Sequence, residues 1–146
     1  MSQRIWKREW SPARMNEFCR GTMLEVIGIE FTEVGPDYVV ATMPVDERTK
    51  QPYGILHGGA SAALAESLGS MASNMALEDG WEALGIELNA NHLRALTTGT
   101  VTGRVTPVHI GRTLHVWEIE MTGEAGKPSC VSRLTVLVRE RRTPTT

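Results

Sequence analysis

The chain has 146 residues, of which 41% are hydrophobic and 22% are charged, and its formal net charge at pH 7 is -2. This length fits one domain with a core of its own. A nearly neutral chain gives no electrostatic reason to bind nucleic acid or an anionic membrane surface. Cys19 and Cys130 form no CxxC pair, and the first ten residues lack the apolar segment of a signal peptide. Free thiols and a cytoplasmic location are therefore expected.

The N-terminal part is expected to form a short helix followed by two strands. Ser11 followed by Pro12 is typical of a helix start, and Gly21 is typical of a helix end. The pattern then predicts a further helical turn, two strands and a polar, turn-prone connection, over residues 22–28, 29–35, 37–46 and 47–56.

Residues 58–77 predict one long helix made mostly of small side chains. Glu66, Asn74 and four serines make it a poor membrane span, which needs about 20 strongly apolar residues, so a buried helix of a soluble domain is expected. A glycine inside a helix costs roughly 1 kcal/mol relative to alanine, and small residues let a neighbour approach closely. Since one sheet covers only one side of a helix, a second copy of the chain is expected on the other side.

Four apolar runs with alternating pattern follow the helix, separated by turn signals at residues 98–99, 109–111 and 123–126. The runs are Leu84, Ile86 and Leu88; Val101, Gly103 and Val105; Trp117, Ile119 and Met121; and Leu134, Val136 and Val138. Strands that follow a helix, instead of alternating with helices, indicate an α+β fold in which an antiparallel sheet curls around one long central helix. The chain ends, residues 1–4 and 140–146, are expected to fray.

Several kinds of chemistry lack support in the sequence. The segment GGASAA departs from the G-x-S-x-G nucleophile turn at Ala63 and follows no strand, so Ser61 is interpreted as a packing residue. Neither G-x-G-x-x-G after a strand nor G-x-x-x-x-G-K occurs, and no cofactor is expected. The histidines lack the spacing of a metal site, and no metal is expected. They are His57, His92, His109 and His115.

Glu66 is the one charged residue between Gly58 and Ala76. A carboxylate isolated in an apolar, partly buried helix should have a raised pKa and be available as a base or nucleophile, although a solvated helix residue is the alternative. At the helix start, His57-Gly58-Gly59 offers free backbone N–H groups that can bind a developing oxyanion. The alternative there is that the glycines only make the turn.

The stretch QPYGILHGGASAALAESLGS, with ATMPVDERTKQP before it and GIELNANHLR, PVHIGR and SRLTVLV after it, closely resembles the hotdog-fold acyl-CoA thioesterases. It is most similar to their aryl branch, which includes the 1,4-dihydroxy-2-naphthoyl-CoA thioesterase of menaquinone synthesis and the proofreading thioesterase of enterobactin synthesis. The resemblance runs from about Ile5 to Val138. It implies a hotdog fold, dimers whose sheets join, usually a homotetramer, and no cofactor.

The resemblance also implies roles for individual residues. Glu66 matches the family's catalytic carboxylate, which acts as the nucleophile or as the base that activates water. Gly58 matches the residue whose backbone N–H polarises the thioester carbonyl. Gln51 and His57 match residues that orient the carbonyl or the water, and Ser70 matches a residue close to the reacting group.

A substrate path is implied in the same way. Its residues are Gly59, Gly85, His92, Leu93, Arg94, Ala95, His109, Ile110, Gly111 and Arg112. Arg94 and Arg112 are candidates to meet the phosphates of a CoA or phosphopantetheine arm, or are merely solvated. Met71 departs from the family's pattern and is expected to line the acyl pocket, where it would tune the choice of acyl group.

Gly58 and Glu66 are eight residues apart, which is roughly 12 Å along a helix. Both must lie about 3 Å from one reacting centre, so they are expected to come from different subunits, with the active site at a dimer interface. The predicted function is hydrolysis of an aromatic or β-keto-like acyl thioester on CoA or a carrier protein. The alternatives are a non-catalytic acyl-CoA or acyl-carrier binding protein and a hotdog enoyl hydratase or dehydratase.

Overall fold

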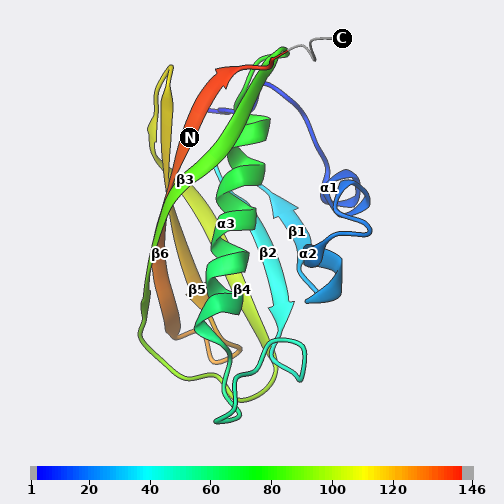
Figure 1. Cartoon of the computed structure of the whole chain (residues 1–146), viewed down its shortest axis with the longest axis vertical. Helices are drawn as coiled ribbons and strands as arrows, with labels where there is room; N and C mark the ends of the chain where they lie inside the picture. The colour runs from blue at the N-terminus through cyan, green and yellow to red at the C-terminus, as the bar shows by residue number, and fades with distance from the viewer. Residues whose placement is uncertain (1–2, 143–146) are drawn as a thin grey trace.

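The computed structural model describes residues 3–142, in which one long helix, α3 (Gly58–Met75), lies against a six-stranded antiparallel sheet that curls around it (Figure 1). The other elements are α1 (Pro12–Phe18), α2 (Met23–Val26), β1 (Glu30–Val34), β2 (Val39–Pro44), β3 (Trp81–His92), β4 (Thr100–Ile110), β5 (Leu114–Thr122) and β6 (Pro128–Glu140). The strand order is β1-β2-β4-β5-β6-β3. The predicted α+β fold with one central helix is confirmed.

Helices α1 and α2 form a small module beside β1. Ser11 caps α1 as predicted. Asn16 ties α1 to the sheet, because its side chain donates to the Phe31 carbonyl at 3.0 Å and accepts the Phe31 N–H at 2.8 Å. Gly21 and Gly28, with φ of 70° and 76°, lie on either side of α2. Only glycine adopts such angles without strain, so two left-handed residues fix where α2 begins and ends.

Both ends of α3 are closed by specific contacts. At the start, His57 Nδ1 accepts the Gly59 N–H at 2.7 Å. At the end, the Met75 carbonyl accepts the N–H groups of Lys7 and Arg8 at 2.8 and 2.9 Å. The segment before α1 thereby satisfies a helix-terminal carbonyl that would otherwise be left without a partner.

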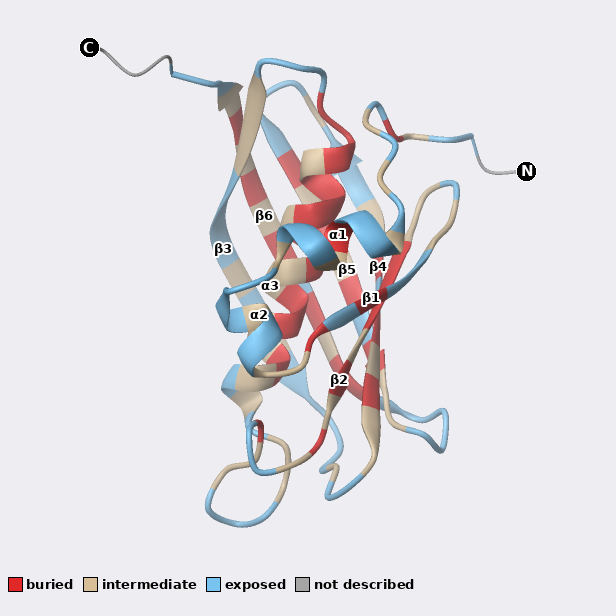
Figure 2. Ribbon diagram, turned by 90° about the vertical axis from the view of Figure 1, so that its right-hand side faces the viewer, coloured by how far each residue is buried: buried red, intermediate tan, exposed pale blue. Residues whose placement is uncertain are grey.

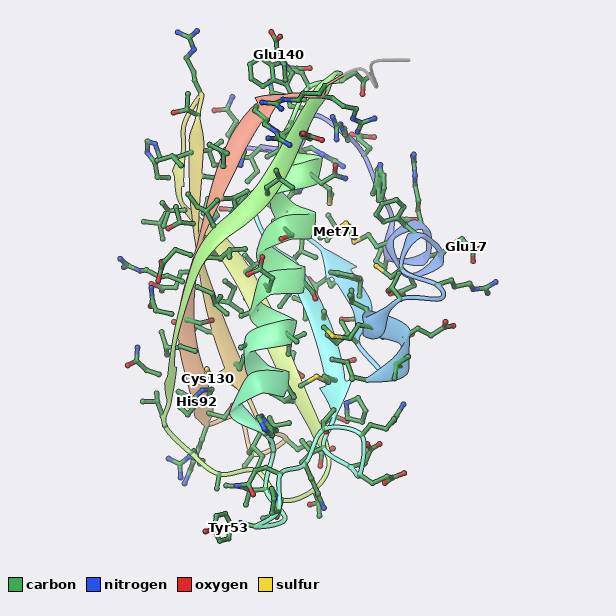
Figure 3. The ribbon with its side chains drawn as sticks, viewed as in Figure 1. Glu17, Tyr53, Met71, His92, Cys130 and Glu140 are labelled. Atoms are coloured by element: carbon green, nitrogen blue, oxygen red, sulfur yellow. The ribbon has the colours of Figure 1, made fainter. Side chains whose placement is uncertain are left out.

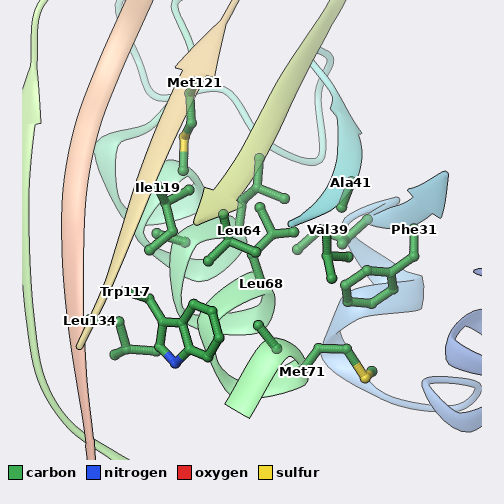
Figure 4. Packing of buried hydrophobic residues seen from close by; sticks show 14 of the residues in the cluster. Phe31, Val39, Ala41, Leu64, Leu68, Met71, Trp117, Ile119, Met121 and Leu134 are labelled. Atoms are coloured by element: carbon green, nitrogen blue, oxygen red, sulfur yellow. The ribbon is translucent and has the colours of Figure 1, made fainter. Parts of the chain in front are cut away.

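The core lies between α3 and the concave face of the sheet, where the buried residues of both gather (Figure 2). Leu64 and Leu68 project from α3 into this core (Figure 4). A Cβ built on Gly69 would lie 2.5 Å from Cδ2 of Leu134, and one built on Gly103 would lie 2.7 Å from Cδ1 of Leu68. Glycines on both sides therefore allow the close approach of helix and sheet that the small residues predicted.

Strand β3 is an edge strand with a bulge between Gly85 and Glu87. Leu84 and Ile86 are 43% and 57% exposed, whereas Leu88 is partly buried against the core. The interpretation that these three apolar residues alternate on one face is wrong, because the bulge inserts a residue and changes which positions face inward. The strand therefore combines exposed apolar side chains with a free backbone edge.

Two strands extend beyond their predicted ends. β4 continues to Ile110, into the turn expected at residues 109–111, and β6 continues to Glu140, into the tail expected to fray. The Arg141 N–H then donates to the Gly80 carbonyl at 2.8 Å, which holds the end of β6 beside the start of β3. The outermost tail residues, 1–2 and 143–146, lie outside the described residues.

A buried polar cluster joins α3 to β5. The Trp117 indole N–H donates to Ser73 Oγ at 2.6 Å, and the same oxygen lies 3.1 Å from Nδ1 of His115. His115 is fully buried. Burial lowers its pKa, and so does the charge of His109, against a hydrogen bond with the Gly111 backbone that raises it. The cluster therefore favours a neutral imidazole inside the fold.

This buried neutral His115 predicts a loss of stability in acid. Its pKa in the folded state lies below its ordinary value of 6.5, so at intermediate pH the unfolded chain binds the proton first. The stabilisation is present above about pH 6.5 and is lost as the pH falls through the folded-state pKa. In thermal melts at pH 7.5 and 5, the wild type and the exposed-site control His92→Asn should lose more in Tm than His115→Asn. Equal losses in all three proteins would contradict this role of His115.

Candidate active site

The first turn of α3 leaves one backbone donor free. The Gly59 N–H bonds to His57 Nδ1 at 2.7 Å. The N–H groups of Ala60 and Ser61 donate to the His57 carbonyl at 2.9 and 3.2 Å. Among the described residues, the Gly58 N–H has no hydrogen-bond partner. It is the available donor at the positive end of the helix dipole, where an oxygen that gains negative charge is stabilised.

A cavity of about 370 Å³ opens beside this donor. Six of the residues predicted for the site line it together: Gln51, Gly58, His92, Leu93, Arg94 and Ala95. Ser61 and Ser129 line it as well, and both are buried. Ser61 was interpreted as a packing residue alone. Its position three residues after Gly58 would have indicated that it lies on the same side of the helix and lines the same cavity. Ser129 carried no signal in the sequence.

Two side chains near the start of α3 keep a free donor. Gln51 accepts the Tyr53 N–H with its Oε1, which leaves its amide hydrogens as donors at the cavity wall. His57 uses Nδ1 as an acceptor, so the proton of its neutral ring is assigned to Nε2. His92 packs directly on the helix start, since a Cβ built on Gly58 would lie 2.9 Å from its Nε2. Gln51 and His92 thus share one cavity with Gly58, whereas His57 lines a neighbouring cavity.

Glu66 lies two turns further along α3 and is partly buried. Its carboxylate rests against β3, because a Cβ built on Gly85 would collide with Oε1 of Glu66. Burial raises the pKa of Glu66, and a hydrogen bond from the Ser70 side chain partly opposes this. The raised pKa predicted from the sequence is confirmed. Gly85 makes room for the carboxylate, and Ser70 holds it.

One protomer does not bring Gly58 and Glu66 to the same atom. The α3 helix is unbroken between them, so they stay roughly 12 Å apart along its axis. His92 marks the helix-start end of the molecule in Figure 3, and Met71 lies well along the helix from it. If both groups act on one carbonyl, as the sequence predicts, they must come from two copies of the chain.

The predicted residues around the turn after β4 lie at the far end of α3. Ile110, Gly111 and Arg112 line a different cavity of about 490 Å³, together with Leu77 just beyond the helix end and Trp81. This hairpin stands at the opposite end of the molecule from the start of α3 (Figure 1). His109 is on the last part of β4, and its Nε2 would lie 2.5 Å from a Cβ on Gly111. The protomer thus divides the expected substrate path into two separate groups.

Met71 and Gly59 occupy different surroundings from those two groups. Met71 is 7% exposed and belongs to the core cluster, on the Phe31 side of α3 (Figure 4). Its expected role in an acyl pocket stays a prediction. Gly59 lines a third cavity of about 230 Å³, between the start of α3 and α2.

The histidines, cysteines and acidic residues remain dispersed in the fold. Within residues 3–142, no group of three or more His, Cys, Asp or Glu side chains is placed to hold a metal ion. Cys19 and Cys130 are free. None of the described helices has the length and apolar character needed to cross a membrane.

Comparison with known proteins places these features in a family. The family model described as "Thioesterase superfamily" matches residues 53–130. The proofreading thioesterase EntH of Cronobacter turicensis is 49% identical over 134 residues, which cover 92% of this chain and 98% of that protein. The 1,4-dihydroxy-2-naphthoyl-CoA hydrolase of Escherichia coli K12 is 46% identical over 134 residues, with the same coverage of 92% and 98%.

Solved structures agree with the sequence comparisons. The crystal structure of a thioesterase from Haemophilus influenzae is 44% identical, covers 97% of this chain and 99% of that one, and superposes with a TM-score of 0.94. The residues that the family model matches, 53–130, include Gly58, Glu66 and Ser70, and Gln51 lies just before them. The chain therefore belongs to the thioesterase superfamily and is an enzyme of that class, a thioester hydrolase.

Proposed function

We propose that the protein hydrolyses an aromatic acyl thioester carried on CoA or on a carrier protein, in an active site completed by a second copy of the chain. The observation that carries the proposal is the spacing on one helix of an unpaired amide at Gly58 and a carboxylate of raised pKa at Glu66. The name of the E. coli relative supports an aromatic acyl group and makes 1,4-dihydroxy-2-naphthoyl-CoA the first substrate to test.

The chemistry follows from the donors and the carboxylate. The thioester oxygen accepts the Gly58 N–H and the Gln51 amide, which stabilise the negative charge that develops on it. Glu66 of the second copy either removes a proton from the water that attacks the carbonyl carbon or attacks the carbon itself. In the second route, water then hydrolyses the acyl-glutamate anhydride. In both routes the carbon–sulfur bond breaks, the thiol leaves with a proton, and the acid keeps the oxygen of water.

The small-residue face of α3 supports the pairing that this chemistry needs. Gly58 and Glu66 lie equally far on either side of Ala62, so a two-fold axis near Ala62 that pairs antiparallel helices sets each Glu66 beside the partner's Gly58. Gly58, Ala62 and Glu66 are spaced four residues apart along one face of α3, and neither Gly58 nor Ala62 brings a bulky side chain to that face. Two equivalent active sites would result.

Strand β3 supports the same arrangement. Its free edge and its exposed Leu84 and Ile86 would be covered if the β3 strands of two copies paired antiparallel. Antiparallel pairing also reverses the ends of the second copy. The hairpin that carries Arg112 would then approach the helix start and Arg94 of the other copy, which would join the two separated groups of substrate residues.

The first prediction from this proposal concerns thiol release. The wild type should cleave 1,4-dihydroxy-2-naphthoyl-CoA and benzoyl-CoA, and Glu66→Gln should lower kcat about 1,000-fold, because the amide can neither accept the proton nor attack the carbonyl. Glu120→Gln, at an exposed position on β5, serves as the control and should retain activity. Binding of acyl-CoA or acyl carrier protein without cleavage, or hydration of an enoyl-CoA instead, would favour one of the two alternative functions.

The second prediction concerns the shared site. Glu66→Gln and Gln51→Ala are each expected to be nearly inactive, but a coexpressed mixture should recover about a quarter of wild-type activity. Half of the randomly formed dimers are mixed, and one of the two sites in each mixed dimer has both native residues. Glu66→Gln with Glu66→Ala is the matched control, because both changes remove the same carboxylate and no native site can form. Recovery no greater than in this control would place the whole site in one chain.

The third prediction concerns how much the ionised Glu66 carboxylate lowers the stability of the fold. Because its pKa is raised above 4.5 in the fold, stability is greatest with the neutral carboxyl and is lost as the pH rises through the folded-state pKa. Glu66→Gln should therefore have a higher Tm than the wild type at pH 8, and the difference should shrink at pH 4. A lower Tm of the variant at pH 8 would show that the contacts of the carboxylate outweigh its burial.

A further inference from the structure

The short helix α2 forms one wall of the third cavity, which lies beside the start of α3. This cavity measures about 230 Å³, and the mechanism above does not use it. On the α2 side the cavity is lined by Met23 and Ile27. On the α3 side it is lined by His57, Gly59, Ala60 and Ala63.

The cavity lies next to the proposed reacting centre. His57 and Gly59 line it, and these residues stand immediately before and after Gly58, whose N–H would hold the thioester oxygen. The larger cavity of about 370 Å³ lies on the β3 side of the same helix turn, where His92 and Arg94 line it. The two cavities therefore flank one backbone donor, with β3 on one side of α3 and α2 on the other (Figure 1).

A thioester carbon carries two substituents besides its oxygen, the sulfur with its long arm and the acyl group. If the arm occupies the cavity on the β3 side, where Arg94 can meet a phosphate, the acyl group is directed to the α2 side. The surface there suits an apolar, flat group, because Ala60, Ala63 and Gly59 leave α3 without bulky side chains. Arg48, Thr49 and Lys50 also border this cavity. The Arg48 guanidinium is paired with Asp46 at 2.7 Å, and the Thr49 hydroxyl donates to the Pro44 carbonyl at 2.6 Å.

The backbone around α2 is held firmly against the sheet, but its Met23 side chain can change conformation. A Cβ on Gly28 would lie 2.8 Å from Pro44, so the chain directly after α2 packs tightly against β2. Ile27 is partly buried against the core. Met23, in contrast, is 57% exposed, and methionine is the apolar side chain that adjusts most readily to differently shaped partners.

We propose that Met23 and Ile27 form the outer wall of the acyl pocket and determine the size of the acyl group that the enzyme accepts. This inference rests on the proposed function, since it takes Gly58 as the residue that holds the carbonyl. It assigns acyl choice to the α1–α2 module, whereas the groups that cleave the thioester belong to α3 and the loop before it.

The test compares acyl preference in variants of one helix. Met23→Phe fills the cavity and should lower kcat/KM for 1,4-dihydroxy-2-naphthoyl-CoA about 10-fold relative to propanoyl-CoA. Met23→Ala enlarges it and should shift this ratio the other way. Val26→Phe is the control, because Val26 is 68% exposed on the same helix and does not line the cavity, and its ratio should stay within about twofold of the wild type.

The outcomes separate this inference from the proposed function. An unchanged ratio in both Met23 variants, or an equal shift in Val26→Phe, overturns the role of α2, while loss of activity in Glu66→Gln would leave the proposed function standing. A wild type that releases no thiol from any thioester overturns both. Met23→Ala only removes atoms from an exposed position, so it keeps the test decisive even if Met23→Phe proves poorly folded.

Discussion

The rigidity of α3 is the constraint on which the proposed site depends. A continuous helix holds the Gly58 amide and the Glu66 carboxylate roughly 12 Å apart along its axis, and no glutamate rotamer spans that distance. Other features of the protomer are unfavourable in isolation: a partly dehydrated carboxylate, exposed Leu84 and Ile86 on a free edge, and a helix face without large side chains. In the proposed dimer all of them lie in one interface, so the pairing that completes the catalytic group also covers what the single chain leaves open.

Within the protomer, α3 and β3 position their functional side chains reciprocally. The β3 residue His92 lies against Gly58 of α3, and the α3 residue Glu66 lies against Gly85 of β3. Each chemical group therefore occupies the space that a side chain on the opposite element would fill. The bulge that follows Gly85 belongs to the same region, so the strand is irregular where the carboxylate rests on it. A glycine in each element sets how closely the two groups can approach the backbone.

The sequence predicted best those features that local chemistry decides. The start of α1 was predictable from its capping residues, and the helix α3 from its small-residue composition. The raised pKa of Glu66 was predictable because no other charged residue lies on that helix. Which side chains of β3 face the core was not predictable, because the alternation of Leu84 and Ile86 gives no sign of the bulge between Gly85 and Glu87. Likewise, Ser129 reaches the cavity through pairing of distant segments, with its carbonyl accepting the Leu93 N–H at 2.8 Å, and no local pattern encodes that meeting.

The helical turn over residues 22–28 was predicted and is present as α2, but its place beside the proposed site was not predicted. A four-residue helix between two left-handed glycines is too short for its sequence pattern to show which side faces a ligand, yet it supplies a wall of the proposed acyl pocket that lies outside the α3–sheet core. Groups that must hold a fixed geometry lie on rigid elements, and groups that select among ligands lie on connecting segments. A change at Met23 alters the space available to an acyl group without moving Gly58 or Glu66. Reaction and selectivity are thereby placed on parts of the chain that can change independently.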